Sequence, residues 1–204
     1  ISVMSENPDL VGRLFSAKIV ELGLASIPGY TGRSGMPTGP YIQYWPALID
    51  SKYIKERVHF DGKLTEVEPT SQMNFEEIYY QKEPYENKVP DYKNTTKTKF
   101  GSLYGTRSGD KGGCANLGVW AKNQEAYSYL YEFLSVDKLK ELLPDLREYE
   151  IERYELPNIL SLNFYVHDIL QDGVSSSTRL DGQAKSLGEY LRAKDIDVPD
   201  FLTS

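Results

Sequence analysis

The chain has 204 residues, of which 40% are hydrophobic and 26% are charged, and these fractions are ordinary for a globular protein. They exclude a wholly disordered chain and a fibre, and no apolar run reaches the roughly 18 residues that a membrane helix needs. Twenty-three basic against thirty acidic residues give a net charge of −7, whereas a protein that coats nucleic acid without sequence preference carries a positive net charge. One cysteine, Cys114, excludes an internal disulfide. We therefore expect a soluble protein of the cytoplasm, or of an organelle, that binds neither nucleic acid nor a membrane.

Residues 1–67 predict a helix, an irregular strand and a hairpin. The helix spans 8–23, because Asn7-Pro8 supplies an N-cap followed by proline at the first helical position, and apolar residues follow at helical spacing. A strand over 41–49 is restricted to an edge by its proline. Two alternating runs over 57–67, joined by Asp61-Gly62, predict a β-hairpin with a primed turn.

Residues 68–97 form a stretch rich in tyrosine and proline. Four of the sixteen tyrosines fall here, among charged residues and three prolines that interrupt every periodicity. Tyrosine rings pack against apolar surface while their hydroxyls stay in water. We predict a linker that lies on the surface of a folded neighbour; the alternative is a free tether.

Residues 98–204 alternate between strand and helix patterns, and we predict that they form one domain. Strands are predicted over 99–106, 117–121, 149–156 and 174–180, and helices over 123–134, 135–143 and 183–193. Residues 160–170 fit either state. This order predicts an α+β sandwich in which helices cover one face of an antiparallel sheet.

The most distinctive segment runs from Gly105 to Gly118 and contains five glycines in fourteen residues. Glycine lets backbone N–H groups turn toward a common point, so the segment predicts a loop that binds an anion, with Arg107 and Lys111 adding positive charge. Such a site suits a phosphate, a carboxylate or the tail of coenzyme A. The residue order is neither a Walker A loop nor a Rossmann fingerprint. The alternative is a long polar loop whose Arg107 pairs with Asp110.

Two sets of candidate site residues follow from this segment and its neighbours. In the first set, Asp110 or Ser108 would handle a proton. The candidate ligand-binding residues are Arg107, Lys111, Gly112, Gly113, Asn116, Arg153, Asn163 and Arg179. In this second set, glycine N–H groups and basic side chains hold the anion, and the asparagines hold a carbonyl. The alternative for Arg179 is a solvated side chain ahead of a helix that Asp181 caps.

Cys114 lies in the same glycine-rich segment, and a nucleophilic cysteine needs a base such as His167. The residues favour a simpler interpretation, in which Cys114 is a small loop residue and His167 is satisfied beside Asp168. Two histidines far apart in the sequence and one cysteine give no metal-ligand spacing, so we expect no metal site.

Ordered motifs extend over most of residues 98–204. They are Arg107-Ser-Gly-Asp-Lys-Gly-Gly, Ala115-Asn-Leu-Gly-Val-Trp-Ala121, Arg153-Tyr-Glu-Leu-Pro-Asn158, Leu162-Asn-Phe164, Gly173-Val-Ser-Ser-Ser and Arg179-Leu-Asp-Gly-Gln-Ala-Lys-Ser-Leu187. With these motifs the chain resembles the acyclic terpene utilisation (AtuA-like) family. The resemblance implies that residues 98–204 form the family's small ferredoxin-like C-terminal domain and residues 1–67 the tail of its large α/β N-terminal domain. We therefore expect the chain to be the tail of a longer protein.

The resemblance also implies a place in the breakdown of branched, terpene-derived acids through acyl-CoA intermediates, without assigning a reaction. Our first hypothesis is part of an acyl-CoA-processing enzyme, with a coenzyme A thioester or a carboxylate as ligand and no resident cofactor. The expected partners are the missing N-terminal domain and further copies of the chain, as a homo-oligomer. The second hypothesis is a non-catalytic domain for assembly or regulation, and the third is a free-standing binding module.

Overall fold

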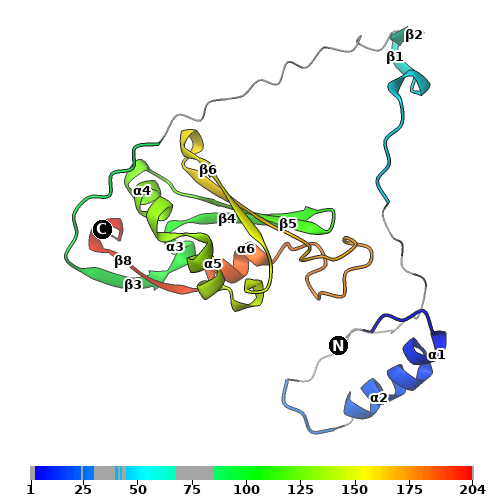
Figure 1. Ribbon diagram of the computed structural model, residues 1–204, viewed down its shortest axis with the longest axis horizontal. Helices are drawn as coiled ribbons and strands as arrows, with labels where there is room; N and C mark the ends of the chain where they lie inside the picture. The colour runs from blue at the N-terminus through cyan, green and yellow to red at the C-terminus, as the bar shows by residue number, and fades with distance from the viewer. Residues whose placement is uncertain are drawn as a thin grey trace. The chain divides into compact units, whose positions relative to one another are not determined.

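The computed structural model describes residues 3–23, 25–29, 40, 42, 45–67 and 85–203. The chain divides into two compact units, of which residues 45–86 form one, and residues 1–44 and 87–204 form the other. Figure 1 follows the chain by colour from the N-terminus to the C-terminus. The elements that position the candidate site all lie in residues 85–203.

The N-terminal segment carries two short helices in place of the single predicted one. They are α1, Pro8–Val11, and α2, Arg13–Gly23. The Asn7 side chain accepts a hydrogen bond from the backbone N–H of Asp9 at 3.0 Å, which confirms the predicted N-cap. The break falls at Gly12, whose ψ of −140° is far from helical, because glycine tolerates such backbone angles.

Residues 45–67 contain the β-hairpin that the sequence predicts. Strand β1, Glu56–Phe60, pairs antiparallel with β2, Lys63–Val67. The turn residues Asp61 and Gly62 have φ of 47° and 74°, as a primed turn requires. The strand predicted over 41–49 is absent from residues 45–49, where Pro46 removes a backbone donor, and positions 41, 43 and 44 lie outside the described residues. A 3-10 helix, Ser51–Tyr53, follows instead.

The C-terminal part is an α+β domain built on a four-stranded antiparallel sheet, which confirms the predicted fold class. Its strands, in spatial order, are β4 (Gly105–Lys111), β5 (Cys114–Trp120), β7 (Ser161–Val166) and β6 (Ile151–Leu156). A separate two-stranded sheet joins β3, Thr95–Lys99, to β8, Asp195–Pro199. This second pairing brings the first and last strands of the domain together.

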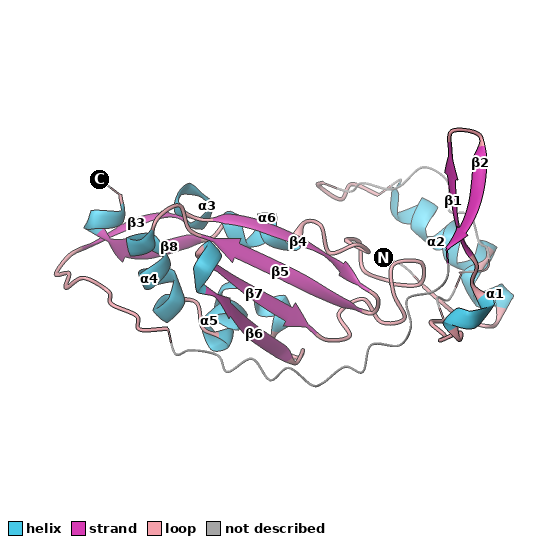
Figure 2. Ribbon diagram, turned by 90° about the horizontal axis from the view of Figure 1, so that it is seen from above, coloured by secondary structure: helices cyan, strands magenta, loops and turns pink. Residues whose placement is uncertain are grey.

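Helices cover one face of the four-stranded sheet (Figure 2). They are α3 (Phe100–Leu103), α4 (Gln124–Phe133), α5 (Val136–Leu142) and α6 (Leu187–Arg192). The side chains of Asn123 and Ser135 cap α4 and α5, because each accepts a hydrogen bond from a backbone N–H group of the next turn; the cap at Ser135 was predicted. The fully buried core side chains include Leu117, Val119, Leu162 and Phe164 of the sheet and Tyr127, Leu130, Leu139 and Leu191 of the helices.

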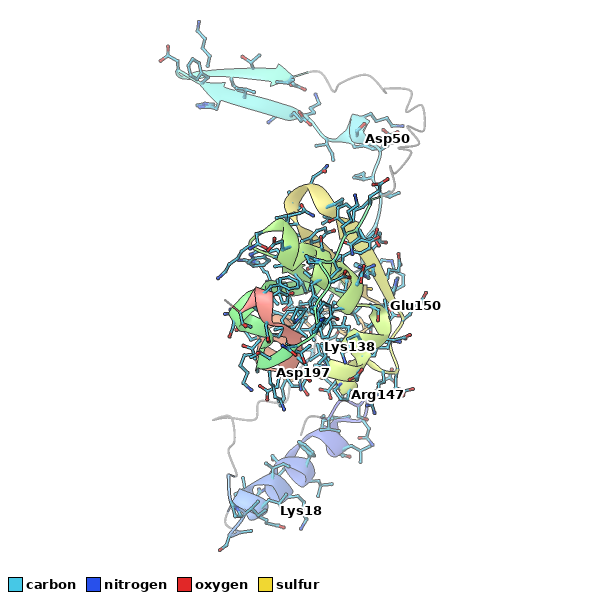
Figure 3. All side chains as sticks on the ribbon, turned by 90° about the vertical axis from the view of Figure 1, so that its left-hand side faces the viewer. Lys18, Asp50, Lys138, Arg147, Glu150 and Asp197 are labelled. Carbon is cyan, nitrogen blue, oxygen red and sulfur yellow. The ribbon has the colours of Figure 1, made fainter. Side chains whose placement is uncertain are left out.

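Short 3-10 turns connect several of these elements. They are η2 (Pro144–Leu146), η3 (Pro157–Ile159) and η4 (Asp200–Leu202). The first of them buries Leu146 under the end of α5, whereas the following charged side chains, Arg147 and Glu150, stand on the outside of the domain (Figure 3). η2 also forms one wall of a pocket beside α6.

The glycine-rich segment is a β-hairpin, which corrects the prediction of a loop. β4 and β5 pair in full register from Gly105 opposite Trp120 to Lys111 opposite Cys114. Only Gly112 and Gly113 form the turn, and Gly112 has a φ of 63° that favours glycine. Polar residues on both sides of β4 hid the alternation by which strands are recognised.

Other predicted elements also differ from the observed ones. Residues 160–170 form β7 and then turns, residues 174–180 form turns and no strand, and the last helix begins at Leu187. In the turns, Ser176 Oγ donates to the Gly173 carbonyl at 3.3 Å, and Ser177 Oγ accepts from the backbone N–H of Arg179 at 3.3 Å. Such local side-chain bonds to the backbone compete with strand pairing.

Residues 87–94 lie against α4 and the C-terminal residues. Asn87 Nδ2 donates to the Ser128 carbonyl at 3.0 Å and to Glu132 Oε1 at 2.8 Å. The Tyr92 ring meets the Tyr129 ring edge-on, with centroids 6.2 Å apart. Burial, with Tyr92 and then Asp197 as lesser causes, raises the pKa of Tyr129 to about 12. This end of the predicted linker therefore packs on the domain, and β3 begins at Thr95, inside the range predicted as linker.

Candidate functional site

Alternation along the strands gives the four-stranded sheet two different faces. On β4, Thr106 and Ser108 are buried toward the helices, whereas Arg107 and Lys111 are exposed on the opposite side. We call this opposite side the open face, because α3 to α6 all lie on the other side of the sheet (Figure 2). By register it comprises Arg107, Gly109 and Lys111 of β4, Asn116, Gly118 and Trp120 of β5, Asn163 and Tyr165 of β7, and Glu152, Tyr154 and Leu156 of β6.

Three predicted ligand-binding residues meet at the centre of the open face. Arg107 lies opposite Gly118, which lies opposite Asn163 on the next strand. Asn116 occupies the neighbouring row, and its Nδ2 donates to Asn163 Oδ1 at 3.3 Å. The structure therefore brings Arg107, Asn116 and Asn163 together from three adjacent strands.

Lys185 joins this centre from outside the sheet. Its backbone carbonyl accepts a hydrogen bond from Ser108 Oγ at 3.2 Å, beside the edge strand β4. Its Nζ would lie only 3.0 Å from a Cβ built on Gly109, and Asn116 Oδ1 would lie 4.0 Å from that same Cβ. The ammonium group therefore crosses the edge strand and lies over Gly109, next to Asn116.

Lys185 was missed by sequence reasoning, which assigned it no role beyond a solvated surface side chain. The signal that could have found it is Gly109, because a glycine inside a strand often marks the close approach of another group. The glycine alone does not show which group approaches it. That group is identified only by the three-dimensional course of the residues before α6, which short-range sequence patterns do not predict.

The open face holds two cations without partners. Within the described residues, neither the Arg107 guanidinium nor the Lys185 ammonium makes a side-chain hydrogen bond or an ion pair. Gly109 and Gly118 place no side chain between them and the two asparagine amides. A carboxylate or phosphate oxygen seated there would meet two positive charges and amide N–H donors, a combination that favours anions.

The two predicted catalytic residues lie on the helix-covered side instead. Ser108 Oγ accepts from the Gly188 N–H at 2.9 Å while donating to the Lys185 carbonyl, so its hydroxyl fastens the start of α6 to β4. A Cβ on Gly188 would come within 2.8 Å of Thr106 Oγ1, which shows how closely α6 packs there. Asp110 follows the same alternation, and the structure does not bring it to the open-face cations.

Lys111, Gly112 and Gly113 form the tip of the hairpin and not an anion nest. Lys111 Nζ donates to the carbonyl of Asp110 at 2.9 Å. The Gly113 carbonyl accepts from the Leu170 N–H at 2.8 Å, and a Cβ on Gly113 would clash with the backbone of the same segment. The glycines are therefore required by the turn and by a close backbone contact.

The remaining two predicted ligand-binding residues are separated from the open face. Arg153 points to the helix side, where it donates to the Tyr131 carbonyl at 2.6 Å and to Glu155 Oε1 at 2.8 Å. Its guanidinium also lies 4.8 Å from the Tyr131 ring centroid, so it anchors α4 on β6. Arg179 lines a pocket beside α6.

A second polar group on the open face surrounds Glu152. Its Oε1 lies 2.6 Å from His167 Nε2, and its Oε2 accepts a hydrogen bond from the Tyr154 hydroxyl. The hydrogen bond from Tyr154, followed by that from His167, lowers the pKa of Glu152 from its ordinary value. The same bond raises the pKa of the Tyr154 hydroxyl.

Cys114 lies at the border of this group. Its Sγ accepts from the Asp168 N–H at 3.5 Å, and a hydrogen bond with Cys114 is the main cause that raises the pKa of Tyr165. The contacts of His167 are with Glu152 and, edge-on, with the Tyr165 ring at 4.9 Å. A Cys114–His167 catalytic pair therefore has no supporting contact in this geometry.

Two other features are absent from the described residues, a metal-binding cluster and a membrane-spanning helix. No cluster of three or more His, Cys, Asp or Glu side chains there could hold a metal ion. In the same residues, the helices are too short or too polar to span a lipid bilayer.

Comparison with protein families supports the resemblance seen in the sequence. Residues 98–197 match the family model of the AtuA ferredoxin-like domain. A search of curated proteins and a search of solved structures each found no match to the chain. The assignment of residues 1–67 to a large N-terminal domain lies outside the matched range and stays a prediction.

Proposed function

We propose, from the premise that residues 98–197 form an AtuA ferredoxin-like domain, that this domain binds the anionic group of an acyl-CoA or carboxylate intermediate on its open face. The site consists of Arg107, Lys185, Asn116 and Asn163. The pathway we propose for this ligand is the breakdown of branched, terpene-derived acids, which the family name suggests.

One observation carries the proposal: the Lys185 ammonium lies over the bare backbone of Gly109, beside Asn116 and without a partner in the described residues. An unpaired cation held against a strand costs side-chain entropy that nothing in the domain offsets. A bound anion would offset it, because charge-assisted hydrogen bonds are about twice as strong as neutral ones. The guanidinium of Arg107 and the amides supply further donors for the same oxygen atoms.

The proposal concerns binding and leaves the reaction open. Ser108 is fully hydrogen-bonded inside the domain, so we do not propose it as a proton carrier. The catalytic role predicted for Asp110 stays a prediction, because its carboxylate lies away from the proposed anion site. Assembly with the expected N-terminal domain or with further copies would bring other groups to the open face.

A role in assembly is the second candidate function, and a different part of the open face favours it. Trp120, Tyr154 and Leu156 lie at one end of this face and are 42%, 49% and 42% exposed. Large apolar side chains gathered on one surface are typical of protein contacts. A docked partner would then cover the same sheet face that holds the cations.

The test titrates the full chain, labelled with ¹⁵N, with coenzyme A and with acetate as the minimal carboxylate. We expect saturable shifts of the Gly109 and Gly118 amides and of the asparagine side-chain NH₂ groups. Arg107→Gln and Lys185→Gln should each weaken coenzyme A binding by about tenfold. The matched control is Lys97→Gln, which removes an exposed lysine from β3.

A pair of glycine variants separates the position of Lys185 from its charge. Gly109→Ala keeps both cations but displaces the flexible end of Lys185, so affinity should fall several-fold. Gly118→Ala adds the same methyl group with only ordinary contacts, the nearest at 3.6 Å from the Arg107 carbonyl. Equal losses in both variants would contradict the role of Lys185. If Trp120→Ser changes oligomer size in sedimentation while Lys185→Gln leaves anion binding intact, the assembly role replaces the proposed one.

A further inference from the structure

A pocket of about 400 Å³ lies beside α6, on the helix-covered side of the domain. It is bounded by η2, by the segment 179–181 and by α6. Its volume falls in the range of about 300–1,000 Å³ that is usual for small-molecule sites. Of all residues predicted to bind a ligand, only Arg179 belongs to it.

The floor of the pocket is aliphatic. Leu143 and Leu146 are fully buried, and Leu187 is nearly so, beneath the opening. Leu180 stands at the rim with its side chain 99% exposed. Because the floor leucines leave almost no accessible surface, an aliphatic chain in the pocket would lie against Leu180 and Tyr190, which is 40% exposed, and would remove their apolar surface from water.

The Arg179 guanidinium supplies the polar end of the site. The residue is half-buried, and its side chain makes no hydrogen bond or ion pair with any part of the chain that the structure describes. Its backbone N–H donates to Ser177 Oγ at 3.3 Å, which helps to fix the segment that carries it. A guanidinium binds a carboxylate through two parallel hydrogen bonds.

Two acidic side chains of the pocket limit which anion fits. The Asp181 carboxylate is already engaged, because it accepts bonds from the Lys185 N–H at 2.8 Å, the Ser186 N–H at 2.9 Å and Ser186 Oγ at 2.7 Å. Asp145 is exposed at the rim. A second negative charge on the ligand would meet its carboxylate and be repelled.

We propose that this pocket binds an aliphatic monocarboxylate, with the carboxylate on Arg179 and the hydrocarbon chain against Leu180 and Tyr190. The inference does not depend on the open face, because it uses other residues on the other side of the sheet. The ligand class follows from one unpaired guanidinium, from the accessible apolar side chains of Leu180 and Tyr190, and from an acidic rim that disfavours a second negative charge.

The test titrates the ¹⁵N-labelled full chain with octanoate, below the concentration at which octanoate aggregates. We expect saturable shifts at Leu180, Ser186, Leu187 and Tyr190. Suberate, the dicarboxylate of the same chain length, and octanol, which lacks the charge, should each bind at least tenfold more weakly. Inorganic phosphate should not compete.

Three variants decide the outcome. Arg179→Gln should weaken octanoate binding by about tenfold to a hundredfold, and Arg179→Lys should restore part of the affinity. Leu180→Glu changes an exposed side chain, so the fold survives, and the added charge should also weaken binding. Arg57→Gln, on an exposed strand of the hairpin, is the control and should change nothing.

Each contrary result is distinguishable from failure of the open-face proposal. Octanoate shifts that map to Gly109 and disappear in Arg107→Gln would overturn the pocket while supporting the open face. Suberate that binds as tightly as octanoate, or phosphate that displaces it, would overturn the assigned ligand class. Shifts that never saturate would mean that the pocket does not bind octanoate.

Discussion

Arg107 and Ser108 are neighbours on β4 but face opposite sides of the same sheet, and their surroundings differ completely. Ser108 is buried and makes two hydrogen bonds that hold the start of α6. Arg107 is exposed, and its guanidinium has no partner within the described residues. Both side chains are polar and both fall in the same motif. The helix layer covers the side of the sheet that holds Ser108 and leaves the side that holds Arg107 exposed. This position, and not the chemistry of the side chain, gives Ser108 a structural role and leaves Arg107 accessible to a ligand.

The same division applies to the two faces as a whole. On the covered face, Ser108 and the two terminal nitrogens of Arg153 make hydrogen bonds to the backbone or to other side chains, whereas Thr106 Oγ1 and Arg153 Nε are buried without a partner in the described residues. On the open face, Lys185 lies over the bare backbone of Gly109, and Arg107 occupies the same face of the same strand, two residues away. A buried polar group depends on the protein itself for its hydrogen bonds, whereas an exposed cation is solvated by water and remains accessible to a ligand. The comparison therefore predicts that substitutions on one face change stability and those on the other change binding.

The largest expected effect tests the covered face. Leu117→Ala removes a fully buried side chain of β5, so it should lower the free energy of unfolding by about 2–5 kcal/mol. Asn116→Ala, one residue away on the open face, should cost about 1 kcal/mol or less, since it removes one hydrogen bond near solvent. Urea denaturation of the full chain, followed by tryptophan fluorescence, measures both. Equal costs would mean that the open face is packed against something in solution.

A smaller change in the free energy of unfolding is expected at Arg153, which can be compared with Arg107 because both were predicted to bind a ligand. Arg153→Gln loses the bond to the Tyr131 carbonyl in a largely buried site, so the free energy of unfolding should fall by about 1–3 kcal/mol. Its coenzyme A affinity should not change. Arg107→Gln should show the reverse pattern, because that side chain contributes no contact to the fold. Loss of coenzyme A binding in Arg153→Gln, at full stability, would restore Arg153 to the site.

The smallest effect concerns the carboxylate of Glu152. Its lowered pKa means that it stabilises the fold above its unfolded-state pKa, and this contribution is lost as the pH falls through the folded-state pKa. Tyr154→Phe removes the largest cause, so the Glu152 pKa should rise toward 4.5 and the acid-sensitive contribution should shrink. His167→Gln removes the second cause and should raise it less. A ¹³C NMR titration of the side-chain carboxyl measures both shifts, and a larger rise in His167→Gln would reverse the assigned order.

Local patterns in the sequence predicted those elements whose causes are local. Asn7 and Ser135 cap helices where predicted, because a side-chain oxygen needs only the next turn of backbone. The Asp61-Gly62 turn formed because these residues tolerate positive φ. The family resemblance, carried by motifs from Arg107 to Leu187, was confirmed over residues 98–197.

The errors fall where distant segments meet. Residues 105–118 lack the alternation of polar and apolar residues that is typical of a strand, because β4 carries polar residues on both of its sides. Only the folded structure shows that helices cover one of these sides. Strand β8 was missed, since its partner β3 is almost the whole domain away in sequence. The residues of the candidate site divide in the same way: Arg107, Asn116 and Asn163 lie on the open face, whereas Ser108, Asp110 and Arg153 point to the other face.

By itself, the sequence determined the fold class, the caps at Asn7 and Ser135, the Asp61-Gly62 turn and the family of the C-terminal domain, because these follow from short-range backbone chemistry and from ordered motifs. Only the tertiary structure decided which polar residues lie on the open face. Strand pairing sets which side of β4 each residue occupies, and the helix layer satisfies one side and leaves the other open. The path before α6 then carries Lys185 over Gly109, a meeting of residues far apart along the chain that no local rule contains.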